Sequence, residues 1–223
     1  MEHTNIDNKI QLVSHMGDDL SVVNAARKSY DKCSSEMSQR DIDLLKYMWN
    51  NKHTSPFEFV EFTFLVKCPI PIAKQWMRHR TWSYNEISRR YTDSNIEYYV
   101  PDPFRKQSED NKQASIDEPA LDDQLYHPTY WKYRRAIKSC FEAYDALLKD
   151  GVAKEQARFV LPQAVYTEFY AKTDLSNLLK FIRLRIGTDA QWEMQQYAKQ
   201  LLEIIEPIVP HTVRLFKEEM NIE

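Results

Sequence analysis

The sequence predicts a single α+β domain in which a small antiparallel sheet is flanked by several long helices. Two segments alternate apolar and polar residues, as half-buried strands do, whereas most other apolar residues recur every three or four positions, as in amphipathic helices. The 223 residues contain neither an internal repeat nor a linker that would divide the chain. Residues 1–223 are therefore expected to form one domain.

Helical periodicity predicts the first two helices, over 19–28 and 41–50. Ser38 and Asp41 have the spacing of a capping box at the start of the second helix. The next run, 59–68, alternates and predicts a half-buried strand. One face of this strand carries Phe62, Phe64, Val66 and Cys68, and the other carries Glu61, Thr63 and Lys67.

A short helix is predicted from Pro71 to about His79, because proline suits the first turn of a helix. Within it, Gln75, Arg78 and His79 stand at i, i+3 and i+4, and residues with this spacing share one side of a helix. Three polar side chains are thus expected to point the same way.

The second half of the chain continues with a short strand over 96–100 and a charged stretch, 105–119, which we expect to be a mobile loop or lid. A long amphipathic helix follows from Pro128 to a stop at Asp150-Gly151. The remaining predicted elements are a strand over 165–170, a helix that Asp174 caps and that runs through Arg185 to Gly187, a helix over 190–206 with a capping box at Thr188 and Gln191, and a short helix after Pro210.

The scarcity of glycine excludes the common kinds of phosphate-binding loop. Phosphate-binding loops of the P-loop and GxGxxG kinds need several glycines close together, and this chain has only Gly17, Gly151 and Gly187. A bound nucleotide must therefore be held by side chains. The three cysteines are isolated from one another, so neither a disulfide framework nor a metal site is expected.

Net charge and hydropathy indicate which partners and which cellular compartment to expect. The formal net charge of −3 argues against a surface that coats nucleic acid. No apolar run approaches the roughly 18 residues of a membrane span, and residues 1–8 lack the apolar core of a signal peptide. We expect a cytoplasmic protein that binds neither a membrane nor nucleic acid.

The densest polar cluster is residues 78–91, called the arginine segment below. It holds four arginines and no lysine, and the guanidinium group suits bidentate capture of phosphate or carboxylate. Serine, asparagine, glutamate and tyrosine lie between the arginines and add both donors and acceptors. The segment predicts an anion pocket; the alternative is a solvated turn held by salt bridges.

The arginine segment resembles the signature RHRxxSxNExSxRY of the flavin-dependent thymidylate synthases. The likeness continues through 53–58, 157–162 and 184–193, and it spans about 27–197 in all. All nine defined positions of the signature are filled, by Arg78, His79, Arg80, Ser83, Asn85, Glu86, Ser88, Arg90 and Tyr91.

This resemblance implies reductive methylation of dUMP to dTMP. In that reaction 5,10-methylenetetrahydrofolate donates the carbon and leaves as tetrahydrofolate, reduced FAD supplies the hydride, and NADPH reduces the flavin again. The resemblance also implies a homotetramer whose flavin sites lie where subunits meet. Two alternatives stay open, a relative that methylates C5 of UMP and a non-catalytic nucleic-acid-binding module.

By the same resemblance, Arg185 would be the catalytic residue, lying against the uracil and stabilising charge that develops at N3 and the adjacent carbonyl. Asp174 and Lys180 stand where relatives often carry asparagines that touch the flavin. FAD would be held by His53, Ser55, Arg78, His79, Arg80, Glu86, Asp174 and Lys180. The dUMP site would be lined by Gln75, Arg78, Glu86, Ser88, Arg89, Arg90, Arg158 and Arg185.

Three of these residues have a second interpretation. Ser55, followed by Pro56 and Glu58, also fits a helix N-cap. Ser88 fits a nucleophile as well, but no histidine in the local sequence offers it a base, which favours a binding role. Arg185 and Arg183 stand about 200° apart on a helix, so only one of them can face the ligand.

Overall fold

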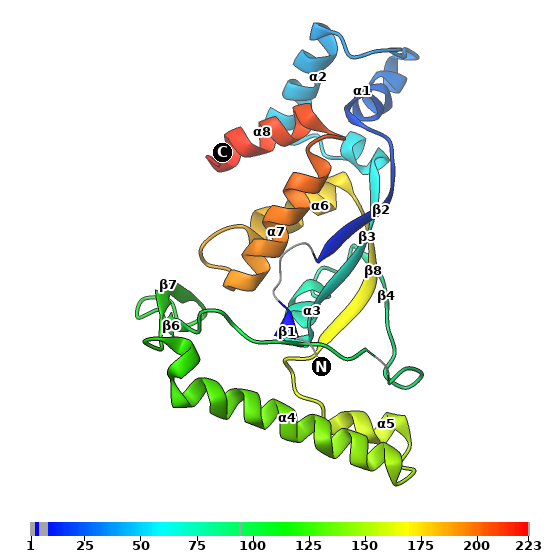
Figure 1. Cartoon of the computed structure of the whole chain (residues 1–223). Helices are drawn as coiled ribbons and strands as arrows, with labels where there is room; N and C mark the ends of the chain where they lie inside the picture. Colours follow the sequence, from blue (N-terminus) through cyan, green and yellow to red (C-terminus); the bar gives the residue numbers. More distant parts are fainter. Residues whose placement is uncertain (1–2, 5–8, 94, 223) are drawn as a thin grey trace.

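A four-stranded antiparallel sheet organises the structure, a computed structural model that describes residues 3–4, 9–93 and 95–222 (Figure 1). The two long central strands confirm the strands predicted at 59–68 and 165–170, although the second runs four residues further than predicted. In spatial order the strands are β2 (Ile10–Met16), β3 (Glu61–Pro69), β8 (Tyr166–Asp174) and β4 (Ser83–Glu86).

Alternation in β3 separates the core face of the sheet from its open face, as predicted. Phe62, Phe64, Val66 and Cys68 have no exposed surface. On the open face, Lys172 of β8 lies 2.7 Å from the carboxylate of Glu61. An antiparallel sheet of this kind needs only one covered face, because its other face is polar enough to meet water.

The edge strands β2 and β4 were not predicted. In β2 the register against β3 shifts between Leu12 and Ser14, and such a bulge breaks the period of two. The four residues of β4 lie inside the arginine segment and carry no apolar alternation. They form a strand because the backbone of β8 offers a free edge, which is a tertiary effect.

Three helices cover the core face of the sheet. Trp76 lies at their centre, with its ring 4.7 Å from that of Phe181 and 6.0 Å from that of Tyr197. Figure 1 shows α6 and α7 side by side against this face. The three helices are α3 (Ile70–Trp76), α6 (Leu175–Arg185) and α7 (Trp192–Ile205).

A second group of helices packs at one end of the sheet. Buried Asp19 accepts hydrogen bonds from the backbone nitrogens of His211 and Thr212, at 2.7 and 3.1 Å, and so joins the first helix to the last. The first two helices confirm the periodicity, and the third confirms the helix expected after Pro210. They are α1 (Asp19–Arg27), α2 (Gln39–Asn50) and α8 (Pro210–Met220).

The long predicted helix lies at the other end of the sheet (Figure 1). It is α4 (Pro128–Lys149), and Gly151 takes a φ of +81° just after it, as the predicted stop requires. Its stripe of buried residues forms a smaller core of its own with Val165 and Ala157. The short α5 (Lys154–Ala157) packs beside it, and the predicted strand over 96–100 is reduced to β5 (Tyr98–Tyr99), paired with β1 (His3–Thr4).

The prediction of a loop or lid over 105–119 is wrong. This stretch is a hairpin of two antiparallel strands, β6 (Arg105–Gln107) and β7 (Ser115–Pro119). The Gln107 amide donates to the carbonyl of Ala114 at 2.8 Å and closes it. Most of its side chains are exposed, so the sequence carries no apolar alternation by which to recognise the strands.

Three local predictions also need correction. The helix α3 ends at Trp76, so Arg78 and His79 lie beyond it. Gln191 is itself the N-cap of α7 and makes no capping bond through its side chain, so the capping box with Thr188 does not form. The predicted N-cap Ser55 is instead the first residue of a 3₁₀-helix. The 3₁₀-helices are η1 (Lys28–Tyr30), η2 (Ser55–Phe59), η3 (Gln124–Tyr126) and η4 (Arg158–Val160).

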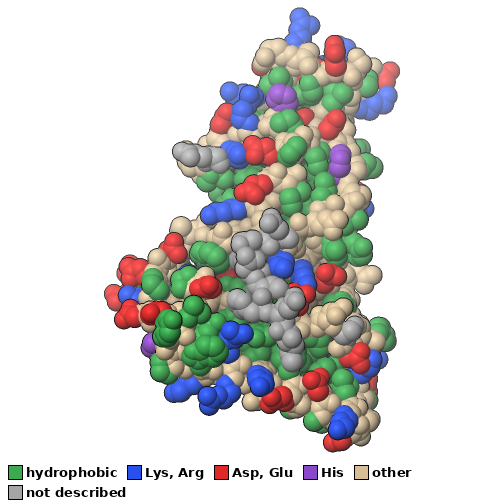
Figure 2. Space-filling view, viewed as in Figure 1, with side chains coloured by type: hydrophobic (Ala, Val, Ile, Leu, Met, Phe, Trp, Pro, Cys, Tyr) green, Lys and Arg blue, Asp and Glu red, His purple; other side chains and the backbone are tan. Residues whose placement is uncertain are grey.

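Charged side chains of both signs alternate over the surface in Figure 2, in keeping with the small net charge. Among the described helices, none combines the length and the apolarity needed to cross a bilayer. The same described residues contain no group of three or more histidine, cysteine or acidic side chains that would suit a metal ion. Most of residues 1–8, which bear on the signal-peptide expectation, lie outside the described part.

Asp41 forms the capping box that the sequence predicts for α2, and it does more. Its buried carboxylate accepts from the backbone nitrogen and the hydroxyl of Ser38, at 3.0 and 2.5 Å, and from Arg27 Nε at 2.8 Å. The hydroxyl of Ser34 adds a bond of 2.9 Å. These partners, Ser38 first, hold the pKa of Asp41 well below its usual range.

We expect Asp41→Asn to lower the free energy of unfolding at pH 7 by about 2–4 kcal/mol, because it leaves Arg27 without its buried partner. The contribution is present above the ordinary aspartate pKa of 3.8 and disappears as acid protonates the folded carboxylate. Urea unfolding of both proteins at pH 7 and in acid measures this contribution. Asp43→Asn, an exposed change in the same helix, is the control; equal effects of the two variants would contradict this account.

Candidate functional site

The arginine segment runs from the end of α3, through β4, to a turn beside α5. Because β4 has four residues, its first and last Cα atoms lie about 10 Å apart, at roughly 3.3 Å per step. Residues 78–80 therefore lie at one end of this strand and residues 88–90 at the other. The fold thus divides the predicted site residues into two groups within one chain.

His79 and Arg185 meet at the first of these places. Arg185 Nε donates to His79 Nε2 at 3.2 Å, and the ring of His79 lies 4.6 Å from that of Phe181. Burial, and then the charge of Arg185, lower the pKa of His79 to about 4. His79 is therefore neutral at pH 7, and its Nε2 carries the lone pair that orients the guanidinium group.

Arg183 points to another side of α6. Its two Nη atoms donate to the carboxylate of Glu219 at 2.8 and 2.9 Å. The hydrogen bonds from Arg183, and then from Lys52, lower the pKa of Glu219 to about 2. Arg183 and Arg185 thus have different partners, but Arg183 also lines the smaller cavity described below, together with His53 and Lys180, so the expectation that only one of the two faces a ligand stays a prediction.

Gln75 lies in the last turn of α3, one turn before His79. Its amide donates to the side chain of Gln191, which donates in turn to Glu193 Oε2 at 2.9 Å. Arg78 and Arg80 follow the helix in the turn, and both side chains are exposed. The predicted common side of a helix is thus replaced by a turn that leaves the two arginines open to solvent.

The second place gathers three residues predicted for dUMP. The hydroxyl of Ser88 accepts from the backbone nitrogen of Arg90 at 3.3 Å. Arg90 Nη2 lies 3.9 Å from the carboxylate of Glu155, and Arg158 Nε donates to the carbonyl of the same Glu155 at 3.3 Å. Two guanidinium groups and a hydroxyl therefore surround one short stretch of chain, a donor set that suits a phosphate.

Glu86 lies between the two places, at the end of β4. Its Oε1 accepts from the hydroxyl of Thr167 at 2.5 Å, which fixes the carboxylate against the start of β8. Since the main-chain nitrogen of Ile87 also bonds to the Glu168 carbonyl, the segment is held firmly here.

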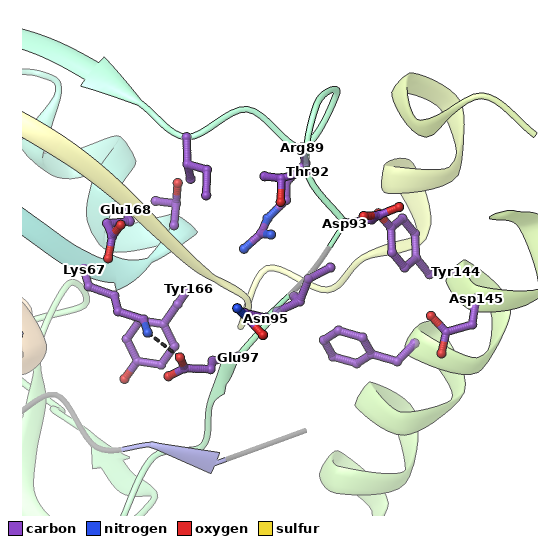
Figure 3. A pocket seen from close by; sticks show the side chains of 14 residues that line it. Lys67, Arg89, Thr92, Asp93, Asn95, Glu97, Tyr144, Asp145, Tyr166 and Glu168 are labelled. Atoms are coloured by element: carbon purple, nitrogen blue, oxygen red, sulfur yellow. Dashed lines mark hydrogen bonds and ion pairs between the residues drawn. The ribbon is translucent and has the colours of Figure 1, made fainter.

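Arg89 departs from its neighbours and enters a cavity of about 780 Å³ between the sheet and α4 (Figure 3). Burial lowers the pKa of Arg89, while the charges of Tyr144 and Glu168 oppose this shift. Figure 3 shows the ion pair of Lys67 and Glu97 across the cavity floor. Further lining residues are Thr92, Asp93, Asn95, Tyr144, Asp145 and Glu168.

A smaller cavity, of about 280 Å³, brings together two residues predicted for the flavin. His53 follows α2, Lys180 extends from α6, and both line the cavity. Its apolar wall comes from Trp49, Phe57 and Leu179. An aromatic and aliphatic wall with lysine at the rim suits a flat ring that carries phosphates.

Ser55 and Asp174 do not line this cavity. Ser55 begins η2 with an exposed side chain. Asp174 caps α6, as predicted, and accepts from the backbone nitrogen of Asn177 at 2.9 Å. Within one chain, capping is thus the contact that Asp174 makes.

The residues predicted for the flavin therefore fall in more than one place. His53 and Lys180 line the smaller cavity, whereas His79 contacts Arg185, which stands about 140° from Lys180 around α6. Cations, a neutral histidine and an apolar wall fit an anionic aromatic cofactor, so the donor set agrees with FAD. A cavity of 280 Å³ in one chain is at the lower limit for a drug-sized ligand and does not enclose so large a group.

Gln191 and Glu193, which were not assigned from the sequence, are linked by hydrogen bonds to the predicted dUMP residue Gln75. Both stand in the 184–193 fragment that carries part of the resemblance, and that was the available signal. The contact of Gln191 with Gln75 cannot be read from the sequence, because 116 positions separate the two residues.

Solved structures with this fold include a UMP/dUMP methylase, PolB, from Streptomyces cacaoi. Bound with 5-Br dUMP, it superposes with a TM-score of 0.83 at 32% identity, over 94% of both chains. Bound with 5-Br UMP, it gives a TM-score of 0.83 at 30% identity, over 99% of this chain and 98% of that one.

Similar sequences carry the name flavin-dependent thymidylate synthase. The relative from Thermus thermophilus is 46% identical over 215 residues, 95% of this chain and 76% of its own. The relative from Thermosipho africanus is 41% identical over 207 residues, 93% of this chain and 90% of its own. The model of the thymidylate synthase complementing protein family matches residues 11–211, and the chain belongs to this family.

We expect His79 to titrate near pH 4, where an ordinary histidine titrates near 6.5. Between these values the unfolded chain binds the proton more readily, so His79 reduces stability as the pH falls from 6.5 to 4. Nuclear magnetic resonance of the imidazole measures the midpoint. In Arg185→Ala the midpoint should rise but stay below 6.5, because burial is the larger cause; a midpoint of 6.5 in the unaltered protein would disprove the assignment.

Proposed function

We propose that the chain is a flavin-dependent thymidylate synthase, which converts dUMP, 5,10-methylenetetrahydrofolate, NADPH and a proton into dTMP, tetrahydrofolate and NADP⁺. Membership of the family gives the class of reaction. The observation that carries the proposal to particular residues is the contact between His79 of the arginine segment and Arg185 of α6. When bound, FAD supplies the hydride in its reduced form, and NADPH restores it.

Arg185 is the residue that we assign to catalysis. Its Nε is engaged by neutral His79, which leaves the two Nη groups to donate to the pyrimidine. A fixed cation beside N3 and the adjacent carbonyl stabilises negative charge on that side of the ring, and this makes C5 the better nucleophile toward the carbon that it attacks. A protonated His79 would repel this cation and lose its lone pair, so the low pKa of His79 serves the arrangement.

Binding is divided between the two ends of the arginine segment. We assign the phosphate and sugar of dUMP to Ser88, Arg90 and Arg158. The two arginines both contact Glu155, and the Ser88 hydroxyl bonds to the backbone of Arg90. Gln75, Arg78, Glu86 and Arg89 complete the proposed dUMP residues, and His53, Ser55, Arg78, His79, Arg80, Glu86, Asp174 and Lys180 are the proposed FAD residues.

A homotetramer with sites between subunits forms part of the proposal. Apolar side chains beside the site residues are exposed in the single chain: Phe159 at 81%, Tyr91 at 78% and Leu184 at 61%. Tyr170, on the open face of the sheet, is exposed at 49%. Large exposed apolar side chains next to site residues suit a surface that another chain covers, and a second chain would join the two halves of the site.

We place the enzyme in the cytoplasm. Its three cysteines, Cys33, Cys68 and Cys140, are all free thiols. Reduced cysteines are typical of proteins that work in a reducing compartment, where the folate and nucleotide substrates are also made.

A second candidate substrate is UMP, because a structural neighbour at 32% identity is a UMP/dUMP methylase. The two nucleotides differ by the ribose 2′-hydroxyl alone. A pocket that rejects one hydroxyl discriminates only about 100-fold unless it is built to do so, so one or two side chains decide the matter.

The proposal is tested by incubating purified protein with FAD, NADPH, 5,10-methylenetetrahydrofolate and either dUMP or UMP. We expect a yellow protein that bleaches with NADPH, and equal amounts of dTMP and tetrahydrofolate from dUMP. Formation of dihydrofolate, or no product from either nucleotide, would refute it. Product from UMP at the same rate would favour the second candidate.

Arg185→Ala should retain FAD and lose methyl transfer by at least about 100-fold, because a preorganised charge at a reacting centre contributes on this scale. Flavin absorbance and single-turnover formation of dTMP measure the two properties. Arg214→Ala, which removes an exposed arginine from α8, should leave both unchanged. Normal turnover in Arg185→Ala would remove this residue from the mechanism.

A further inference from the structure

A line of hydrogen bonds connects the hairpin β6–β7 to Gln75. Arg105, the first residue of the hairpin, forms an ion pair with Glu193 at the start of α7. Glu193 Oε2 accepts from the amide of Gln191 at 2.9 Å, and Gln191 Oε1 accepts from the amide of Gln75. These bonds link the hairpin, the start of α7 and α3, and the last side chain in the line is Gln75 of the proposed dUMP site.

The charge of Glu193 sets the direction of every bond in this line. A carboxylate only accepts hydrogen bonds, so Gln191 must turn its NH₂ group toward Glu193 and its oxygen toward Gln75. Gln75 must then turn its own NH₂ group toward Gln191. An isolated amide can flip at little cost. Here a flip of the Gln75 amide would place its oxygen against the side-chain oxygen of Gln191.

Arg105 in turn fixes Glu193. The exposed fractions of the two side chains are 7% and 5%, so the pair is almost free of water. The guanidinium group lies 4.2 Å from the centre of the Trp192 ring, and its Nε donates to the hydroxyl of Ser115 at 3.0 Å. Tyr99 donates to the same oxygen of Glu193 at 3.1 Å, and burial raises the pKa of this tyrosine.

Stability alone is a weak reason for such a pair. Buried ion pairs often contribute less to folding than apolar residues of the same size, because both charges lose their water. Arg105 Nη1 is also buried without a hydrogen-bond partner among the described residues, which adds to the cost. The arrangement is better suited to fixing an orientation than to holding the hairpin in place.

We propose that Arg105 is a positioning residue for the nucleotide, which acts through Glu193 and Gln191 to hold the Gln75 amide in one orientation. Within the hairpin this role belongs to Arg105, the residue that contacts Glu193, whereas its neighbour Lys106 pairs with Glu118. This inference rests on the proposed function, in which Gln75 lines the dUMP site.

The test is a double-mutant cycle on FAD-loaded protein, with dUMP affinity measured by calorimetry. Arg105→Met should weaken dUMP binding about tenfold when Gln75 is present and less than about twofold in the Gln75→Ala background. Arg105→Lys, which keeps the charge but not the fork, should weaken it about threefold. The control is Lys106→Met, which removes an exposed cation of the same strand, 3.0 Å from Glu118, and should change nothing.

Gln191→Ala is the second variant, for the case in which loss of buried Arg105 prevents folding. It leaves the ion pair of Arg105 and Glu193 intact but breaks its link to Gln75, so it should reproduce the tenfold loss and the same dependence on Gln75.

Two results overturn the inference: equal weakening in both backgrounds, which is the mark of a merely structural role, or unchanged affinity in Arg105→Met and Gln191→Ala. If the unaltered protein fails to bind dUMP, the proposed function falls first and the inference with it. If that protein binds dUMP and the effects are additive, the inference alone falls.

Discussion

The nine-residue pairing of β3 with β8 is the constraint on which the rest of the structure depends. Each strand leads directly into a helix on the core face, β3 into α3 and β8 into α6, and the antiparallel pairing starts these helices at opposite ends of the sheet. The eleven residues of α6 rise about 16 Å, at 1.5 Å each, and this length returns Arg185 toward the turn after α3. The site is therefore assembled by the sheet, although no sheet residue was assigned to catalysis.

The elements of this fold that could be predicted from the sequence are those that bury one face of side chains. The run 59–68 has one face against the core and the other open, so its alternation was plain, and the helices that bury one stripe were equally clear. The hairpin at 105–119 has almost no core face, and the bulge in β2 breaks the alternation between Leu12 and Ser14. These strands form through backbone hydrogen bonds, so the pattern of hydrophobic side chains does not reveal them.

The site shows the same division. The arginine segment could be recognised from residue types and spacing, and the two arginines that the helical angle sets apart on α6 contact different partners, Glu219 and His79. The grouping of Gln75, Arg78 and His79 failed because α3 ends at Trp76, a boundary that periodicity does not fix within two or three residues. The link from Gln75 to Glu193 joins positions far apart in sequence, and only the folded chain reveals it.

The scarcity of glycine has an evolutionary consequence. In a glycine-rich loop the main-chain amides hold the phosphate, and they stay in place whichever side chains change around them. Here almost every group that we assign to a ligand is a side chain, so a single codon change can remove it, lengthen it or reverse its charge. Such a scaffold diverges readily toward new nucleotides, whereas a loop of backbone amides resists drift.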